Sequence, residues 1–156
     1  MPSFRLAGLD PAPFAPLFLL DDAQLAVRGI ARRFADADRG FPCRVGLEDA
    51  RRGDELLLLP YGHQPALSPY RACGPVFVRR DARRRVLAPG DVPPYVADRL
   101  ISLRAYDAAH LMVDAEVREG GAVGAWLEDA FGRSEVAYVH LHNARRGCYS
   151  CLAERA

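Results

Sequence analysis

The 156-residue chain contains no lysine, and all 21 of its basic residues other than histidine are arginine. This absence excludes a Schiff-base lysine, a lysine general base and the lysine of a phosphate-binding loop. Any anion that the chain binds must therefore be held by arginine, histidine or backbone amides. The planar fork of an arginine side chain suits carboxylate and phosphate groups, although a GC-rich coding bias also explains the preference for arginine.

The sequence also lacks a strong charge imbalance and long hydrophobic runs. Its formal net charge is +1, which gives no electrostatic reason to expect a nucleic-acid partner. The apolar runs are far shorter than a membrane span, and the first residues do not have the pattern of a signal peptide. We therefore expect a cytoplasmic protein without a membrane partner; the sequence leaves its oligomeric state open.

Cysteine is scarce, with four residues in the whole chain. In a reducing cytoplasm we expect these residues to be thiols, metal ligands or redox groups rather than structural disulfides. Cys148 and Cys151 are separated by only two residues, so a bond between them would close a strained ring. We expect this pair to remain unlinked in the cell.

The hydrophobic pattern predicts an α+β fold, with short helices packed on a mostly antiparallel sheet. A chain of this length, half of it hydrophobic, suits a single domain spanning residues 1–156. Strands of this sheet are predicted at residues 56–59, 101–106, 111–117 and 136–142. Residues 122–132 are the best candidate helix, and we expect Trp126 and Leu127 to pack against the sheet.

The segment YVHLHNARRGCYSC, residues 138–151, concentrates the side chains that bind metals, carry protons or act as nucleophiles. A Cys-x-x-Cys pair with two nearby histidines can supply four zinc ligands. This pattern predicts a zinc site formed by His140, His142, Cys148 and Cys151. The alternative is that the two cysteines are small apolar core residues, since a domain of this size does not need metal to fold.

The same segment also allows a catalytic interpretation. Cys148 would be the nucleophile, and His142 or His140 would be the base that activates it. A thioredoxin-like redox pair is disfavoured, because that motif begins a helix after an early strand and does not lie at the end of a chain. We therefore name His142 and Cys148 as the candidate catalytic residues.

Strand alternation predicts which of these side chains lie together. In residues 136–143, His140 and His142 share one strand face, because side chains two apart point the same way. In SLRAYD, residues 102–107, the same rule places Arg104 and Tyr106 on one face. If the two strands are neighbours, these four side chains line a common surface. The alternative is an ordinary solvent-exposed sheet face.

Three segments place arginine, histidine or tyrosine beside proline, glycine or cysteine, namely FPCRV, YGHQP and SPYRACGP, and SLRAYD combines an arginine with a tyrosine. Rigid loops of this kind can form an anion-binding cleft. The predicted ligand-binding residues are Arg44, His63, Tyr70, Arg71, Arg104, Tyr106 and Asn143. In the alternative interpretation, the arginines pair with internal carboxylates, for which the candidates are Glu48, Asp49, Asp107 and Asp114.

These segments, together with HNA-x-x-GC at residues 142–148, resemble the bacterial family catalogued as domain of unknown function 1203. The resemblance covers most of the chain, from about residue 4 onward, and the motifs are specific in combination. It implies a single-domain, soluble bacterial protein. It supplies no catalytic residues, so the site is argued from residue chemistry alone.

The sequence therefore supports three functions from different classes. The best interpretation is a protein or enzyme that binds a small anionic molecule in a cleft of arginine, histidine and cysteine side chains. The second is a zinc-binding protein, and the third is an interaction module without chemistry. Whether the chain is an enzyme remains open at this stage.

Overall fold

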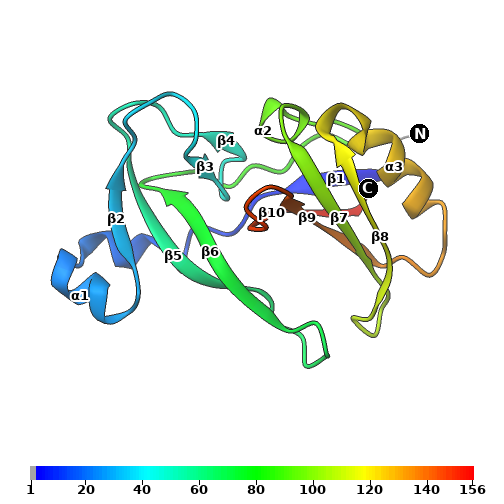
Figure 1. Cartoon of the computed structure of the whole chain (residues 1–156), viewed down its shortest axis with the longest axis horizontal. Coiled ribbons are helices and arrows are strands. Elements are labelled where there is room, and N and C mark those ends of the chain that lie inside the picture. Colours follow the sequence, from blue (N-terminus) through cyan, green and yellow to red (C-terminus); the bar gives the residue numbers. More distant parts are fainter. Residues whose placement is uncertain (1–2) are drawn as a thin grey trace.

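The computed structural model describes residues 3–156 and contains two five-stranded sheets (Figure 1). The first sheet has the strand order β1-β10-β9-β7-β8, and its neighbouring strands are all antiparallel. Its strands are β1 (Phe4–Ala7), β7 (Leu100–Tyr106), β8 (Met112–Glu119), β9 (Tyr138–Asn143) and β10 (Tyr149–Arg155). The two ends of the described chain therefore pair with each other at one edge of this sheet.

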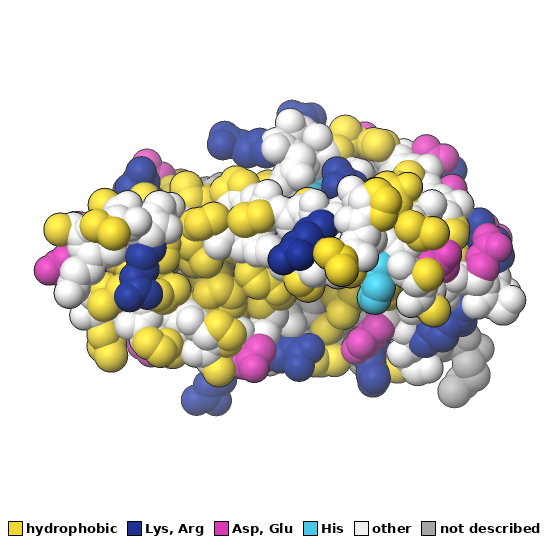
Figure 2. Space-filling model, turned by 90° about the horizontal axis from the view of Figure 1, so that it is seen from below, with side chains coloured by type: hydrophobic (Ala, Val, Ile, Leu, Met, Phe, Trp, Pro, Cys, Tyr) yellow, Lys and Arg dark blue, Asp and Glu magenta, His cyan; other side chains and the backbone are white. Residues whose placement is uncertain are grey.

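The second sheet has the order β2-β5-β6-β3-β4. Its pairs are antiparallel except for β3 and β6, which are parallel. The strands are β2 (Ala31–Phe34), β3 (Pro42–Cys43), β4 (Glu48–Asp49), β5 (Glu55–Gln64) and β6 (Ala72–Arg79). Seen from below, hydrophobic side chains cover much of the face on the side of β2, β5 and β6 (Figure 2).

The helical segments are all short: η1 (Ala15–Leu19), α1 (Asp22–Val27), α2 (Pro94–Ala97), η2 (Gly120–Ala122) and α3 (Val123–Phe131). A reciprocal capping box begins α1, where Asp21 accepts from the Gln24 amide and the Gln24 side chain accepts from the Asp21 amide. No helix within residues 3–156 is long and apolar enough to cross a membrane.

The main hydrophobic core lies between the first sheet and the helices. Ile101, Leu103 and Leu141 from the strands meet Leu127 and Phe131 from α3, and all five are buried. Trp126 is partly buried against the same cluster. The prediction that this helix packs Trp126 and Leu127 against a sheet is therefore confirmed.

The predicted fold class is confirmed in outline, since short helices accompany mostly antiparallel strands. The prediction of one sheet is wrong. Residues 56–59 belong to β5 in the second sheet, whereas the other three predicted strands lie in the first. Leu57 and Leu59 are buried in a second core beneath β5. An apolar run indicates a buried strand, but it does not indicate which sheet the strand joins.

A close backbone contact ties the two sheets together. Gly8 follows β1, and a Cβ atom at this position would lie 2.1 Å from the Val45 carbonyl oxygen, so no side chain fits there. The Leu9 amide donates to the Arg44 carbonyl oxygen at 2.9 Å. The segment after β1 therefore holds the loop that follows β3, and this loop carries the buried Arg44 side chain.

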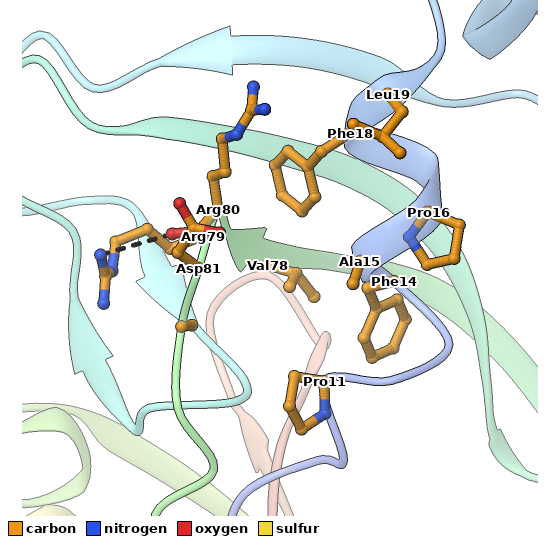
Figure 3. Close-up of a pocket in the computed structure, with 11 residues that line it drawn as sticks. Pro11, Phe14, Ala15, Pro16, Phe18, Leu19, Val78, Arg79, Arg80 and Asp81 are labelled. Carbon is orange, nitrogen blue, oxygen red and sulfur yellow. Dashed lines mark hydrogen bonds between the residues drawn. The ribbon is translucent and has the colours of Figure 1, made fainter.

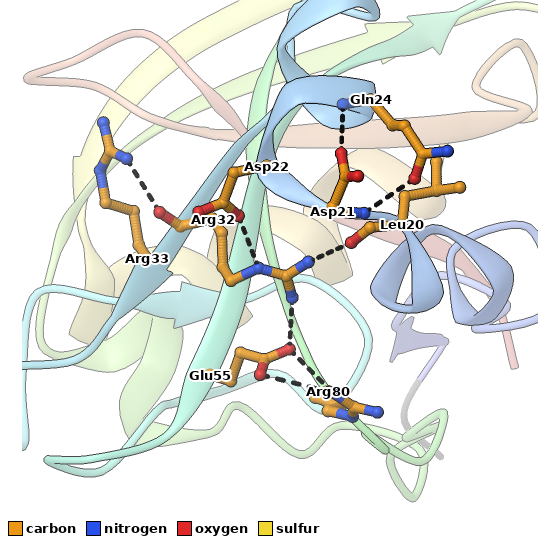
Figure 4. A network of polar contacts seen from close by, with 8 residues as sticks. All are labelled: Leu20, Asp21, Asp22, Gln24, Arg32, Arg33, Glu55 and Arg80. Carbon is orange, nitrogen blue, oxygen red and sulfur yellow. Dashed lines mark hydrogen bonds and ion pairs between the residues drawn. The ribbon is translucent and has the colours of Figure 1, made fainter.

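An ion-pair network holds the η1–α1 segment against the second sheet (Figure 4). The Arg32 guanidinium contacts Asp22 at 2.9 Å and Glu55 at 2.8 Å, and it also donates to the Leu20 carbonyl oxygen. Arg80 makes a second contact with Glu55 at 3.2 Å. Arg32 and Glu55 have little exposed side-chain surface, 16% and 18%, so solvent screens their contact less than a surface pair.

We expect Arg32→Met to lower the free energy of unfolding by about 1–2 kcal/mol, because it leaves Glu55 with one charged partner and the Leu20 carbonyl with none. The matched control is Arg33→Met, since the neighbouring Arg33 is exposed and donates only to a backbone carbonyl. Urea denaturation measures both variants. Equal stability of the two would contradict a structural role for this network.

Candidate functional site

The polar face of β7 and β9 forms the centre of the candidate site. The cross-strand pairs are Ser102 with His142, Arg104 with His140, and Tyr106 with Tyr138. Directly opposed residues of an antiparallel pair lie on the same face, with Cβ atoms about 4.5–5.5 Å apart. The structure therefore brings Arg104, Tyr106, His140 and His142 to one face, as the alternation pattern predicts. Leu103 and Leu141 point into the main core on the other side.

Three histidines meet at this face. One ring nitrogen from each of His63, His140 and His142 lies within 4.8 Å of the other two. The His63 and His142 rings are perpendicular, with centroids 4.9 Å apart. His63 comes from β5 in the other sheet and lies at a register shift between Tyr61 and Gln64. Such irregularities re-aim side chains, and here the strand carries His63 to the histidines of β9.

The Tyr149 ring packs against all three histidine rings. Its ring is stacked on His63 at 5.7 Å and meets His140 and His142 edge-on at 5.4 and 5.8 Å. Tyr61 and Tyr106 extend the aromatic contacts on either side. All four histidines of the chain belong to this contact network, since His110 packs on Tyr138. The histidines thus lie in a mostly aromatic environment.

Burial determines the protonation state of the histidines. Desolvation lowers the pKa of His140 to about 3 and that of His142 to about 4, and the charge of Arg104 acts in the same direction. The pKa of His63 is also lowered, by desolvation first and by Arg104 second. All three imidazoles are therefore neutral near pH 7, and each has one nitrogen lone pair.

These lone pairs have no partner within the described chain. His142 Nδ1 lies 3.0 Å from the Gly147 carbonyl oxygen; a carbonyl can only accept, so Nδ1 carries the proton and Nε2 the lone pair. Among residues 3–156, no hydrogen bond reaches His142 Nε2, His140 Nδ1 or His63 Nδ1, although all three atoms are buried. Buried polar atoms without partners are rare, so these nitrogens point to a ligand.

Arg104 is half-buried beside these histidines. Within residues 3–156, its side chain has neither an ion pair nor a hydrogen bond. Two of the candidate internal carboxylates are engaged elsewhere, since Asp49 pairs with Arg99 and Asp114 with Arg133. Among residues 3–156, Glu48 forms no ion pair with Arg104. Asp107 accepts from the backbone amides of its own turn. The carboxylate-paired alternative therefore does not hold for Arg104.

Arg44 has a different environment. Its side chain is 2% exposed and donates to the carbonyl oxygens of Pro42 and Tyr149 and to the Cys148 sulfur at 3.1 Å. The Asn143 side chain also approaches this sulfur, at 3.8 Å. No carboxylate within residues 3–156 pairs with Arg44. Arg44 therefore connects β3 to β10, and its donors are used by the fold.

Two further predicted ligand-binding residues, Tyr70 and Arg71, lie outside the three-histidine group. Tyr70 and Arg71 are exposed in the turn between β5 and β6. The Tyr70 ring meets Tyr106 edge-on at 5.8 Å, which places this turn near the site. The Arg71 side chain has no hydrogen bond or ion pair within residues 3–156. Its role in binding remains a prediction.

The two C-terminal cysteines do not join the histidines in the described chain. Cys151 lies opposite Leu141 and is buried in the main core, where burial raises the pKa of its thiol to about 12. The cause is a bulge between Tyr149 and Cys151. Tyr149 is opposite His142, so a regular ladder would place Cys151 opposite His140; one extra residue turns it to the core face. The group of side chains close enough to share a metal ion therefore contains His63, His140 and His142 and no cysteine.

Cys148 is half-buried in the turn between β9 and β10, and all four cysteines are free thiols. Within residues 3–156 its sulfur accepts hydrogen bonds from Arg44 and Asn143 and forms none with a histidine. The pairing of Cys148 with a histidine base remains a prediction. The involvement of His63 in the histidine group and the central place of Tyr149 are the features that the sequence did not indicate.

Two further cavities lie away from the histidines. One is a groove of about 370 Å³ between η1 and the end of β6, lined mainly by apolar side chains, two prolines and two phenylalanines among them (Figure 3). The other, of about 450 Å³, lies beside Asp49 and Arg99. Neither is lined by a histidine or a cysteine. These two cavities are thus separate from the histidine group.

The buried histidines predict acid sensitivity. Unfolded histidine has a pKa of about 6.5, so below that pH the unfolded chain binds protons that folded His140 and His142 refuse down to about 3 and about 4. Stability should therefore fall with decreasing pH in this window, by up to about 1.4 kcal/mol per pH unit for each histidine.

Urea denaturation in a chelating buffer between about pH 7 and about pH 4 measures this slope. His140→Gln should reduce the slope, because glutamine does not titrate. His110→Gln is the matched control and should keep the slope that His140 and His142 contribute, because His110 lies outside the three-histidine group. An identical slope in H140Q and wild type would contradict the assignment of His140 as a buried neutral histidine.

The cysteines should differ sharply in reactivity. We expect iodoacetamide to modify the exposed Cys73 in the native chain, while Cys151 remains protected until the chain unfolds. Cys151 is 1% exposed, and burial raises the pKa of its thiol, so both access and thiolate population are low. Mass spectrometry of time points measures both sites. Modification of Cys151 as fast as Cys73 would show that Cys151 is not in the core.

Comparisons with known proteins place this chain in a family. Searches among curated proteins and among solved structures gave no significant match. The profile of the family described as "Protein of unknown function (DUF1203)" matches residues 40–155. This range begins later than the resemblance seen in the sequence, and it includes His63, Arg104, His140, His142 and Tyr149. The chain therefore belongs to the DUF1203 family.

Proposed function

We propose that this chain binds a divalent transition metal, zinc in the first place, through His63, His140 and His142. The observation that carries the proposal is the convergence of three neutral imidazoles whose nitrogens lie within 4.8 Å of one another. Each of the three rings has a buried nitrogen without a protein partner within residues 3–156. A metal ion at their centre would satisfy all three rings at once.

The distances between the histidine nitrogens are somewhat longer than those in an occupied metal site. Zinc binds histidine nitrogen at about 2.0–2.1 Å, so two nitrogens of a tetrahedral site lie about 3.3 Å apart. The observed limit of 4.8 Å therefore has to contract by about 1.5 Å, a movement within the reach of rotation about the side-chain torsions. His63 is only partly buried, which leaves it room to move.

The surroundings of the rings also suit a metal. A histidine ligand usually donates its other ring N–H to a carbonyl or carboxylate, which fixes the ring and its tautomer. The contact of His142 Nδ1 with the Gly147 carbonyl oxygen is of this kind. Three histidines leave a fourth coordination position open, as in catalytic zinc sites rather than structural ones. The proposal thus favours a centre that can take an exogenous ligand.

Zinc binding to purified, metal-free protein tests the proposal. We expect one equivalent of Zn²⁺ to bind in a calorimetric titration. The variants His63→Gln, His140→Gln and His142→Gln should each weaken binding by about 100-fold or more, because each removes one of three ligands.

The control for this experiment is His110→Gln, which removes the fourth histidine of the same aromatic network but no member of the three-histidine group. It should bind zinc like wild type. Circular dichroism in a chelating buffer checks that every variant is folded. Absence of zinc binding by folded wild type, or wild-type affinity in H63Q, would refute the proposed centre.

A further inference from the structure

The charges around the three histidines are unbalanced. The group of potential ligands contains no carboxylate, and the imidazoles are neutral, so a bound Zn²⁺ would keep its full charge. Arg104 adds a further positive charge on the same face, opposite His140 in the strand register. Its charge lowers the pKa of all three histidines. A loaded site would carry several uncompensated positive charges in an aromatic, poorly solvated environment.

Such a concentration of charge needs an anion. An uncompensated buried charge is strongly destabilising, and a negative partner removes most of that cost. No acidic side chain among residues 3–156 lies within ion-pair distance of Arg104. The negative charge must therefore come from outside the chain.

The donors available on this face suit an oxygen anion. The Arg104 fork has no other partner within the described chain and can make two parallel hydrogen bonds to a carboxylate or phosphate group. Ser102 lies two residues away on the same strand face, opposite His142. Its hydroxyl makes no hydrogen bond within residues 3–156, so it can donate to the same group. The open position of the metal would take a further oxygen.

We propose that the exogenous ligand of this centre is a small oxyanion, a carboxylate or phosphate group bound jointly by the metal and the Arg104 guanidinium. This inference rests on the proposed metal centre and adds the chemical class of its ligand. Arg104 is the specificity residue, because it is the cation of this face that the fold leaves without a partner in the described chain. Arg44 cannot replace it, since its donors already bind two carbonyl oxygens and the Cys148 sulfur.

Cobalt-loaded protein gives a direct test. Co²⁺ occupies zinc sites, and its visible absorption bands change when the ligands around it change. Acetate and inorganic phosphate are the two probes, titrated separately into protein carrying one equivalent of Co²⁺. We expect a saturable spectral change with at least one of them; the responding probe identifies the carboxylate or the phosphate class.

Arg104→Gln should weaken binding of the responding anion by about ten- to a hundredfold, since it removes a charge-assisted, two-pronged contact. The same variant should bind Co²⁺ as tightly as wild type or more tightly, because a neighbouring positive charge is gone. The matched control is Arg118→Gln on β8. Arg118 is opposite Ile101 in the register and so lies on the other face of the sheet. The Arg118→Gln variant should therefore bind Co²⁺ and the anion with the affinities of wild type.

The outcomes separate the two proposals. If folded wild type does not bind Co²⁺, the metal centre is wrong and the anion site falls with it. If Co²⁺ binds but neither anion changes the spectrum, or R104Q binds the anion like wild type, the metal centre stands and the oxyanion inference is overturned. Equal anion affinity of metal-free and cobalt-loaded protein would also overturn joint binding.

Discussion

The buried guanidinium of Arg44 is the interaction on which the arrangement of the site depends. It is 2% exposed and donates to the carbonyl oxygens of Pro42 and Tyr149 and to the Cys148 sulfur. These contacts attach the loop after β3 to the start of β10, and so join the two sheets. Tyr149 is thereby fixed, and the rings of His63, His140 and His142 pack on it. The planar guanidinium of arginine presents its donors in several fixed directions, whereas the ammonium of a lysine at position 44 would be a single point charge on a flexible stem.

The histidines show how packing prepares a binding site. Burial among aromatic neighbours keeps the rings neutral, and each ring has a buried nitrogen that takes part in no hydrogen bond within the described chain. A hydrophobic replacement would pack as well without the cost of buried polar nitrogens. Three such nitrogens, brought together from β5 and β9, are therefore difficult to explain by stability alone. A shared ligand explains their proximity, their neutrality and the lack of carboxylates in one arrangement.

Local patterns predicted the parts of this site that depend on one strand at a time. Alternation within residues 136–143 placed His140 and His142 on one face, and alternation in SLRAYD placed Arg104 and Tyr106 together. The partnership of His63 depends on contact between two sheets, and sequence alternation carries no information about that contact. Cys151 was misplaced for a related reason. The bulge between Tyr149 and Cys151 adds one residue to the ladder, and one residue is enough to exchange the two faces of a strand.

The arginines illustrate the same limit for charge. Because the chain has no lysine, arginine serves every cationic role, and the sequence cannot separate structural arginines from those that face a ligand. The contacts separate them. Arg32 and Arg99 neutralise internal carboxylates. Arg44 donates to two carbonyl oxygens and a sulfur, and Arg104 keeps a guanidinium without a partner within residues 3–156, on the same sheet face as His140 and His142. An arginine that faces a ligand is thus recognised because it has no partner within the described chain. Whether an arginine has a partner depends on the fold, so the sequence alone does not show it.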